Sequence, residues 1–264
     1  MNRGNAMKNS KIALAVLLAT VLWEAPVAAD DPVATPAPPA ATADRARIFL
    51  NGAFDFGSLA YSQTRTFKEF AENTKVDSQY SAGTGVGFEL GLHWRFKGRL
   101  GAMASVTGSG RDAKASVTAS IPHPLYLNQP RTATASQDNL SYHETTVHLD
   151  FVYAIPSGKK LELLLFAGPS YVDAKTDLIT QLNYKQSYPY DEVTVTSLSQ
   201  AKVGDSGFGF NIGGGLDYRL SPRFGLGAQV RFTAVSTTLA PPEGPTIDID
   251  AGGFQAAFGV RVFF

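Results

Sequence analysis

Cysteine is absent from all 264 residues of the chain. Without it, the protein cannot carry a lipid on a cysteine, close a disulfide or build a Cys-containing zinc site. Acidic and basic side chains balance at 23 each, so electrostatics give no reason to expect a nucleic-acid partner. The four histidines lack the spacing of a metal site, and we expect no cofactor and no bound metal.

Long apolar runs are also scarce, and the clearest one lies near the start, at Ile12–Trp23. Lys8 and Lys11 precede it, and the small residues Val27-Ala28-Ala29 follow. This order predicts a signal peptide over residues 1–29, cleaved near Ala29. An uncleaved anchor is the alternative, but the run is shorter than the roughly 20 residues of a membrane-spanning helix. Residues 30–45 are rich in Pro and Ala and predict a disordered linker, with residues 46–264 as the folded domain.

Glycine is plentiful at residues 206–220, SGFGFNIGGGLDYRL, but it does not form a nucleotide-binding loop. A dinucleotide fingerprint would need a third glycine where Ile212 stands, and the chain contains no Gly-Lys-Ser or Gly-Lys-Thr. The glycines instead alternate with Phe208, Phe210 and other large apolar residues. This period of two predicts a β-strand.

The same two-faced alternation recurs eight times, at about residues 47–56, 85–96, 100–106, 146–155, 161–171, 206–220, 224–232 and 254–264. Tight Gly- and Pro-containing turns at 97–99, 156–160 and 221–223 join three pairs of strands. The other four connections are long and polar, at about 62–82, 108–139, 174–205 and 237–250. We therefore expect an all-β, antiparallel, up-and-down meander of eight strands.

The composition of the two faces favours a membrane barrel over a soluble sandwich. The less apolar face carries glycine, alanine and sparse charges of both signs instead of the lysine and threonine of a hydrated surface. Such a face suits a crowded interior in which ion pairs satisfy one another. The apolar face then meets lipid, and spanning strands in lipid require a closed barrel. The expected interior charge network comprises Asp55, Glu89, His93, Arg95, His148, Asp150, Asp217, Arg219, Arg231 and Arg261, and the expected interfacial aromatics are Trp94, Phe96, Tyr153, Tyr218 and Phe224.

With eight amphipathic strands, alternating short and long connections and the ending Val260-Arg261-Val262-Phe263-Phe264, residues 46–264 resemble the OmpA/OmpX type of outer-membrane β-barrel. The resemblance implies a cell outer-membrane location, short periplasmic turns and long surface loops. It also implies that Phe264 is an assembly signal for the barrel-assembly machinery. Outer-membrane lipid and lipopolysaccharide are the implied surroundings, and we expect a monomer. Unlike for OmpA, we expect no peptidoglycan-binding domain after the barrel.

The fold alone does not fix an activity, and we expect a non-enzymatic structural or surface-interaction role carried by the long loops. Tyr184, Tyr188 and Tyr190 are candidate contacts for a host or envelope ligand. One alternative is a lipid A-modifying hydrolase, because Ser141 and His143 share one face of a strand. A small pore is the other alternative. His93 and His148 face the interior beside acidic neighbours. We interpret them as hydrogen-bonded structural residues, with a metal site or a proton-linked switch as the alternative.

Overall fold

The computed structural model describes residues 45–241 and 244–264. The expected signal peptide and nearly all of the expected linker lie outside these residues. The described residues form ten antiparallel strands: β1 (Ala46–Phe56), β2 (Leu59–Glu69), β3 (Glu72–Ala82), β4 (Gly85–Lys97), β5 (Leu100–Ile121), β6 (Arg131–Ser157), β7 (Leu161–Gln186), β8 (Val193–Arg219), β9 (Phe224–Leu239) and β10 (Ile247–Phe263). Within the described ranges, no helix is long and apolar enough to cross a membrane.

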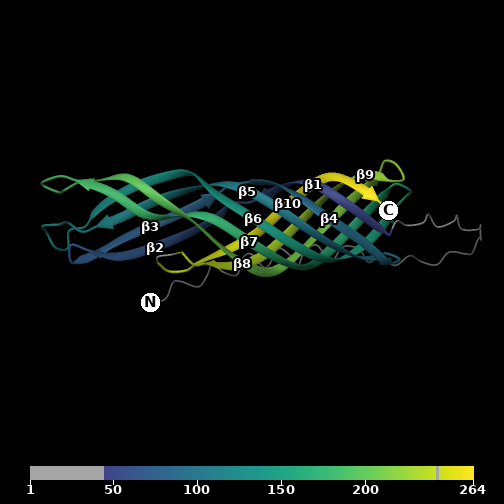
Figure 1. The fold of residues 1–264 in the computed structure, drawn as a ribbon, viewed down its shortest axis with the longest axis horizontal. Helices are drawn as coiled ribbons and strands as arrows, with labels where there is room; N and C mark the ends of the chain where they lie inside the picture. Colours follow the sequence, from purple (N-terminus) through teal and green to yellow (C-terminus); the bar gives the residue numbers. More distant parts are fainter. Residues whose placement is uncertain (1–44, 242–243) are drawn as a thin grey trace, which may run out of the picture. The chain divides into compact units, whose positions relative to one another are not determined.

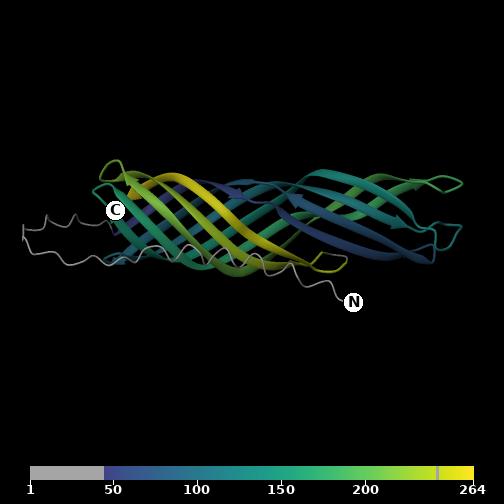
Figure 2. The same ribbon diagram turned by 180° about the vertical axis from the view of Figure 1, so that it is seen from behind.

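Eight of the ten strands pair in a ring. The order is β1-β4-β5-β6-β7-β8-β9-β10, and β10 pairs again with β1. The pairing of Arg47 with Phe263 brings the start of β1 beside the end of β10. Figures 1 and 2 show the twisted strands crossing obliquely along this barrel. The expected eight-stranded antiparallel barrel is confirmed.

Strands β2 and β3 are additional to the prediction. They form a hairpin in the first expected long loop, and β3 pairs with the distal part of β5, from Lys75↔Ser120 to Ala82↔Ala113. The prediction of long loops at 108–139, 174–205 and 237–250 is also largely wrong. Strands continue through most of them, and the connections shrink to residues 122–130, 187–192 and 240–246.

The continuous strands change their polarity part-way along. On β5, even-numbered side chains point outward throughout; they are apolar at Leu100 and Val106 but polar or charged at Asp112 and Lys114. Odd-numbered side chains point inward, and they change from Ser105 and Thr107 to Ala113–Ile121 with its buried Ala, Val and Ile. The apolar face thus moves from the outside to the inside of the barrel without a break in the strand.

We call the part beyond this change the extension: residues 59–82, 109–144, 173–206 and 233–253. Its interior holds an apolar core that includes Tyr61, Val76, Val117, Leu178 and Ile249. A core of this kind is what a β-structure surrounded by water needs, because apolar side chains gain stability by leaving water. The ring is not complete here. Residues 193–208 of β8 pair with β7 alone, and β2 pairs with β3 alone.

Candidate functional site

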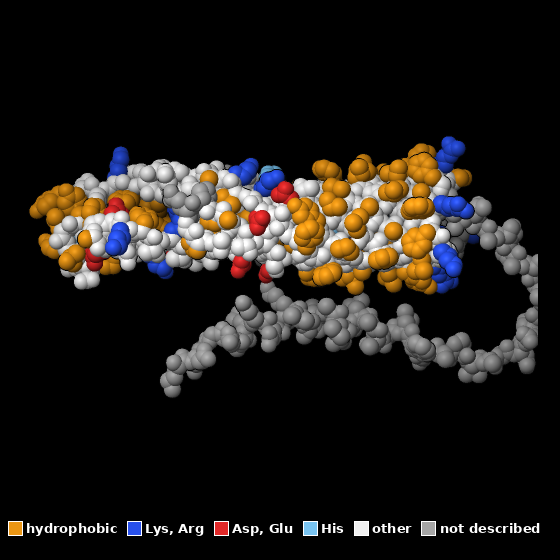
Figure 3. Space-filling model, turned by 60° about the horizontal axis from the view of Figure 1, so that its bottom comes forward, with side chains coloured by type: hydrophobic (Ala, Val, Ile, Leu, Met, Phe, Trp, Pro, Cys, Tyr) orange, Lys and Arg blue, Asp and Glu red, His pale blue; other side chains and the backbone are white. Residues whose placement is uncertain are grey.

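The large apolar side chains on the outer surface fall into two separate groups (Figure 3). The first, which we call the belt, covers the ring from Val86 to Phe96 on β4 and the corresponding parts of the other seven strands. The 11 residues of this β4 segment match the length of a tilted strand that crosses a bilayer. The second group lies at the opposite end, and the wall of the extension between them carries no exposed large apolar side chain among the described residues.

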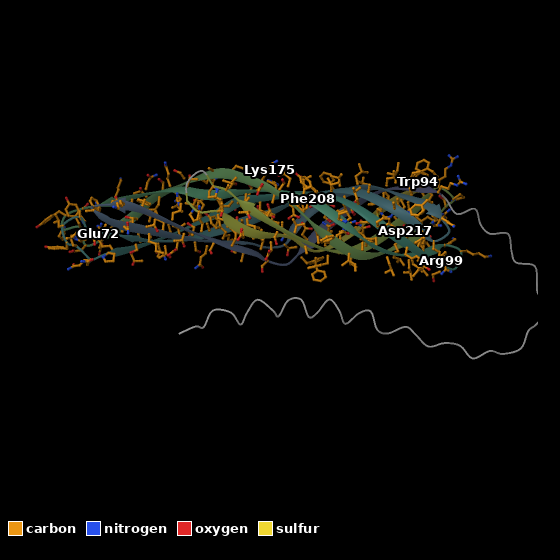
Figure 4. All side chains as sticks on the ribbon, turned by 90° about the horizontal axis from the view of Figure 1, so that it is seen from below. Glu72, Trp94, Arg99, Lys175, Phe208 and Asp217 are labelled. Carbon is orange, nitrogen blue, oxygen red and sulfur yellow. The ribbon has the colours of Figure 1, made fainter. Side chains whose placement is uncertain are left out.

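The interfacial aromatics of the prediction lie on the belt, near its end with the short turns. Their exposed fractions are 60% for Trp94, 56% for Phe96, 41% for Tyr153, 42% for Tyr218 and 58% for Phe224. Phe264, the predicted assembly signal, is 63% exposed. Figure 4 shows Trp94 and Arg99 at this end, and Phe208 near the other edge of the belt. Exposed aromatics at the edge of an apolar belt are typical of a girdle at a membrane interface, so the interfacial role of these residues stays a prediction.

Inside the belt, Arg231 lies between two carboxylates. Its guanidinium is 2.8 Å from Glu89 and 3.4 Å from Asp150. Glu89, which is fully buried, also accepts hydrogen bonds from Asn51 and Gln229. Asn211 donates to Asp150 at 2.7 Å and to Ser170 at 2.9 Å, and Ser170 is bonded to His148 at 2.8 Å.

A second group of charges lies closer to the short turns. Asp217 is 2.8 Å from Arg261 and 2.7 Å from Arg47. Arg47 also reaches Glu162 at 2.6 Å, and Arg95 binds the same carboxylate. Asn51 links the two groups, because its side-chain oxygen accepts from Arg261 at 2.5 Å while its nitrogen donates to Glu89. Arg47 and Glu162 were not among the predicted network residues.

Two inward glycines make room for the rings that line this network. A Cβ at Gly213 would overlap the ring of Phe166, and a Cβ at Gly91 would overlap that of Phe49. The guanidinium of Arg231 lies over the first ring at 5.1 Å, and that of Arg261 lies over the second at 5.0 Å. The glycine-rich face of residues 206–220 therefore serves close packing in a filled barrel.

The remaining predicted interior residues have other partners. Asp55 accepts from Gln255 at 2.8 Å and lies 3.7 Å from Arg111, at the end of the ring next to the extension. Arg219 is half-buried, with its guanidinium 4.2 Å from the centre of the Phe263 ring. His93 is buried without a hydrogen-bond partner on Nε2, and it lies close to Arg47 and Arg95. Among the described residues, no group of His, Asp and Glu side chains forms a metal site.

The second apolar group lies at the turns β2–β3, β5–β6 and β7–β8, which meet at one end in Figures 1 and 2. We call it the tip patch. It consists of Phe67, Phe70, Leu125, Tyr126, Leu127 and Tyr188, which are between 40% and 80% exposed. An exposed apolar group at a loop end, rimmed by polar residues, is typical of an interaction surface.

Side chains beneath the tip patch tie the three turns together. Arg131, which is almost fully buried, donates to Pro122 O at 2.6 Å and across to Gln186 and Tyr190 O at 2.7 Å. Asn128 N donates to Glu72 at 2.9 Å, which joins the β5–β6 turn to the β2–β3 turn. Figure 4 places Glu72 at this end.

The tyrosines of the prediction play different parts here. Tyr184 is half-buried and donates to Glu69, and burial together with that carboxylate raises its pKa. Tyr188 is 80% exposed, and its ring meets the edge of Tyr190 at 6.0 Å. A cavity of about 400 Å³ lies in the same turn, with Lys185, Tyr188 and Glu192 in its lining.

Sequence reasoning missed Leu125-Tyr126-Leu127. Nδ1 of the buried His123 accepts from the backbone N–H groups of Leu125 and Tyr126 at 3.1 and 3.2 Å and so fixes the turn that presents them. The sequence did contain a signal for this patch, because these three apolar residues stand together in a loop that is otherwise polar or proline.

Ser141 and His143 lie on the outer side of β6, just beyond the belt. Ser141 Oγ donates to Asp177 at 2.5 Å and not to His143. Burial raises the pKa of Asp177, but the two hydrogen bonds from Ser141, together with the nearby Lys202 and His143, outweigh it, so the pKa is lowered overall. A carboxylate with a lowered pKa is a poor base, so Asp177 is badly suited to activate Ser141. Ser141 and His143 also lack the hydrogen bond between serine and base that an activated nucleophile needs.

Comparison with known proteins identifies the family. The model for the "Outer membrane protein beta-barrel domain" matches residues 33–261. The chain belongs to this family. Its members' location follows for this protein too: it resides in the cell outer membrane, as the sequence predicted. The curated protein sequences contain no significant match.

Several solved structures of outer-membrane proteins are similar to this chain. OprG from Pseudomonas aeruginosa has a TM-score of 0.53 at 11% identity, over 84% of this chain and 96% of OprG. The outer membrane protease OmpT from Escherichia coli has a TM-score of 0.43 at 9% identity, over 84% and 98% of the two chains. Neisserial surface protein A gives 0.40 at 12%, over 82% and 97%. The likeness to OprG bears on the fold alone.

Barrels of this family have short periplasmic turns and longer extracellular connections. From this pattern we infer that the turns β4–β5, β6–β7 and β8–β9 face the periplasm and that the tip patch faces the outside of the cell. On β6, 14 residues separate Thr145, at the edge of the belt, from Arg131. At about 3.3 Å per residue and a tilt of about 40°, the tip stands roughly 35 Å above the membrane.

Proposed function

We propose that this outer-membrane barrel is a non-enzymatic surface-interaction protein that binds its ligand through the tip patch. The observation that carries the proposal is the position of the patch. Exposed large apolar side chains recur only at the far end of an otherwise polar wall in the described structure, roughly 35 Å from the lipid that explains the belt. Neither the bilayer nor the barrel core accounts for them there.

The tip patch is also held in shape before a ligand arrives. Arg131, Glu72 and Tyr184 fix three turns against one another, and His123 orders the most apolar of them. Preordered side chains lose less conformational entropy on binding, so more of the contact energy appears as affinity. Leucine and tyrosine side chains suit an apolar protein surface or the face of a sugar ring.

The contacts give less support to the two alternatives. The bond from Ser141 to Asp177 leaves His143 without the role of a base on that serine. A pore would need a path through the network of Arg231, Glu89 and Asp150 and the network of Arg47, Asp217 and Glu162, which fill successive levels of the barrel interior. Acyl-chain release from lipid A that disappears in His143→Ala would favour the hydrolase. Conductance steps altered at Arg95 or Arg231 would favour the pore.

The test compares the protein in nanodiscs on an array of extracellular-matrix proteins and glycans. The variant Leu125→Ser/Leu127→Ser removes the centre of the tip patch, and Gln79→Ser/Thr118→Ser makes two serine substitutions on the exposed wall of the extension. We expect binding to at least one component, lost in the tip variant and kept in the wall variant. Equal binding by the wild type and the tip variant, or no binding above empty nanodiscs, contradicts the proposal.

A further inference from the structure

A collar of basic side chains surrounds the periplasmic end of the barrel. It consists of Arg45, Lys97, Arg99, Lys159, Lys160 and Arg223, all exposed. They come from the start of β1 and from all three periplasmic turns, and Figure 3 shows Lys and Arg side chains beside the end of the belt. The cations therefore ring the barrel instead of clustering in one turn.

Within the described residues, no ion pair joins a collar side chain to a carboxylate, and Phe264 O accepts only from the backbone N–H groups of Arg45 and Ala46. The nearby acid, Glu162, is already bound by Arg47 and Arg95 inside the barrel. The extracellular side differs: Lys75 is 2.8 Å from Asp77, Lys114 is 3.5 Å from Asp138, and Lys175 is 3.2 Å from Asp173. Gathered charges of one sign repel one another unless an external partner supplies the opposite charge.

The collar lies at the level where a bilayer carries its phosphate groups. Lys97 directly follows Phe96, and Arg223 directly precedes Phe224, both large and exposed aromatics of the belt. Arg99 Nη1 donates to the hydroxyl of Tyr153 at 3.3 Å. Exposed aromatics sit at the headgroup level of membranes, so the neighbouring cations reach the same depth.

We propose that the collar binds the phosphate groups of anionic phospholipids in the periplasmic leaflet of the outer membrane. The turns β4–β5 and β8–β9 are too short to carry the charges away from the bilayer, so lipid fits better than a polymer deeper in the periplasm. Each cation close to an anionic membrane surface contributes attraction that falls within a Debye length. The collar would thereby also hold the barrel at a fixed depth.

The test measures how strongly spin-labelled phosphatidylglycerol, compared with spin-labelled phosphatidylcholine, associates with the barrel in phosphatidylcholine vesicles. We expect the wild type to prefer phosphatidylglycerol. In Lys97→Gln/Arg99→Gln/Lys159→Gln/Arg223→Gln the preference should fall about two- to fivefold. It should also fall in about 1 M salt, where the Debye length is about 3 Å.

The matched control Lys75→Gln/Lys114→Gln/Lys175→Gln/Lys185→Gln removes the same number of positive charges from the extension, and it should keep the preference. Because both variants have the same net charge, equal loss in both would overturn the proposal. So would a wild type without preference, or a collar whose removal abolishes binding to purified peptidoglycan and leaves lipid preference unchanged. Should the fourfold variant fail to fold, Lys159→Gln/Lys160→Gln alters a turn outside the barrel wall and is compared with Lys75→Gln/Lys114→Gln, which removes the same number of charges.

Discussion

Replacing Arg231 by methionine should destabilise the barrel strongly. The guanidinium is the shared partner of Glu89 and Asp150, and the side chains of all three are at most 1% exposed. Removing it leaves two like charges unpaired in a medium that does not solvate them. Breaking a buried pair in this way costs about 3–5 kcal/mol of the free energy of unfolding. With an m-value of about 2–3 kcal/mol per M, the urea midpoint should fall by roughly 1–2.5 M.

The assay is urea unfolding in lipid vesicles, followed by tryptophan fluorescence and by the difference in gel migration between unboiled and boiled samples. Lys175→Met is the control, because it breaks an exposed ion pair that contributes between 0 and about 1 kcal/mol. The double variant Arg231→Met/Glu89→Leu removes one charge of each sign, and it should be more stable than Arg231→Met alone. If Arg231→Met unfolds at the same urea concentration as Lys175→Met, the inward charges do not depend on one another and our account of the interior is wrong.

Three further predictions concern other parts of the chain. Gly213→Leu should destabilise by about 1–3 kcal/mol because its Cβ meets the Phe166 ring, whereas Gly214→Leu faces outward with room and should change the urea midpoint little. Burial raises the pKa of Tyr61 from 10.0 to about 12, against the smaller opposite effect of its bond with Thr176. The folded state therefore keeps this proton to a higher pH than the unfolded chain does. The resulting contribution to the free energy of unfolding is fully present below about pH 10 and decreases by about 2–3 kcal/mol as the pH rises to 12. Unfolding experiments across that range should show a smaller loss in Tyr61→Phe, and an unchanged slope would contradict the burial of this hydroxyl. His143→Ala should leave the acyl chains of lipid A as they are in wild-type membranes, as judged by mass spectrometry.

The ring could be predicted because lipid imposes a clear pattern. Large residues such as Phe88, Leu90 and Leu92 alternate with small or charged ones, and only strands with one face in lipid need that composition. The extension escaped prediction because water imposes a weaker pattern. Its inward residues on β5 are mostly alanine, and its outward ones are Ser, Thr and Lys, so the alternation carries little contrast in size or hydropathy. The amino-acid sequence of such strands resembles that of polar loops.

The candidate sites were predictable to different degrees. The inward parity of Glu89 and Arg231 followed from alternation, but their pairing joins residues 142 positions apart and depends on strand tilt and register. The tip patch depends on three turns meeting in space, which no local pattern encodes. Tyr188 could be predicted because it stands among other tyrosines, whereas Leu125 and Leu127 lie in a proline-containing loop whose alternation predicts no strand.

The unbroken strands between the belt and the tip have a mechanical consequence. A flexible loop that catches a ligand stretches under load and keeps the force away from the barrel. Here β5, β6, β7 and β8 run from the membrane almost to the tip, each 22 to 27 residues long and hydrogen-bonded to its neighbours. A sideways pull on the tip therefore acts on the barrel as a lever arm of roughly 35 Å, and the resisting torque must come from the lipid around the belt.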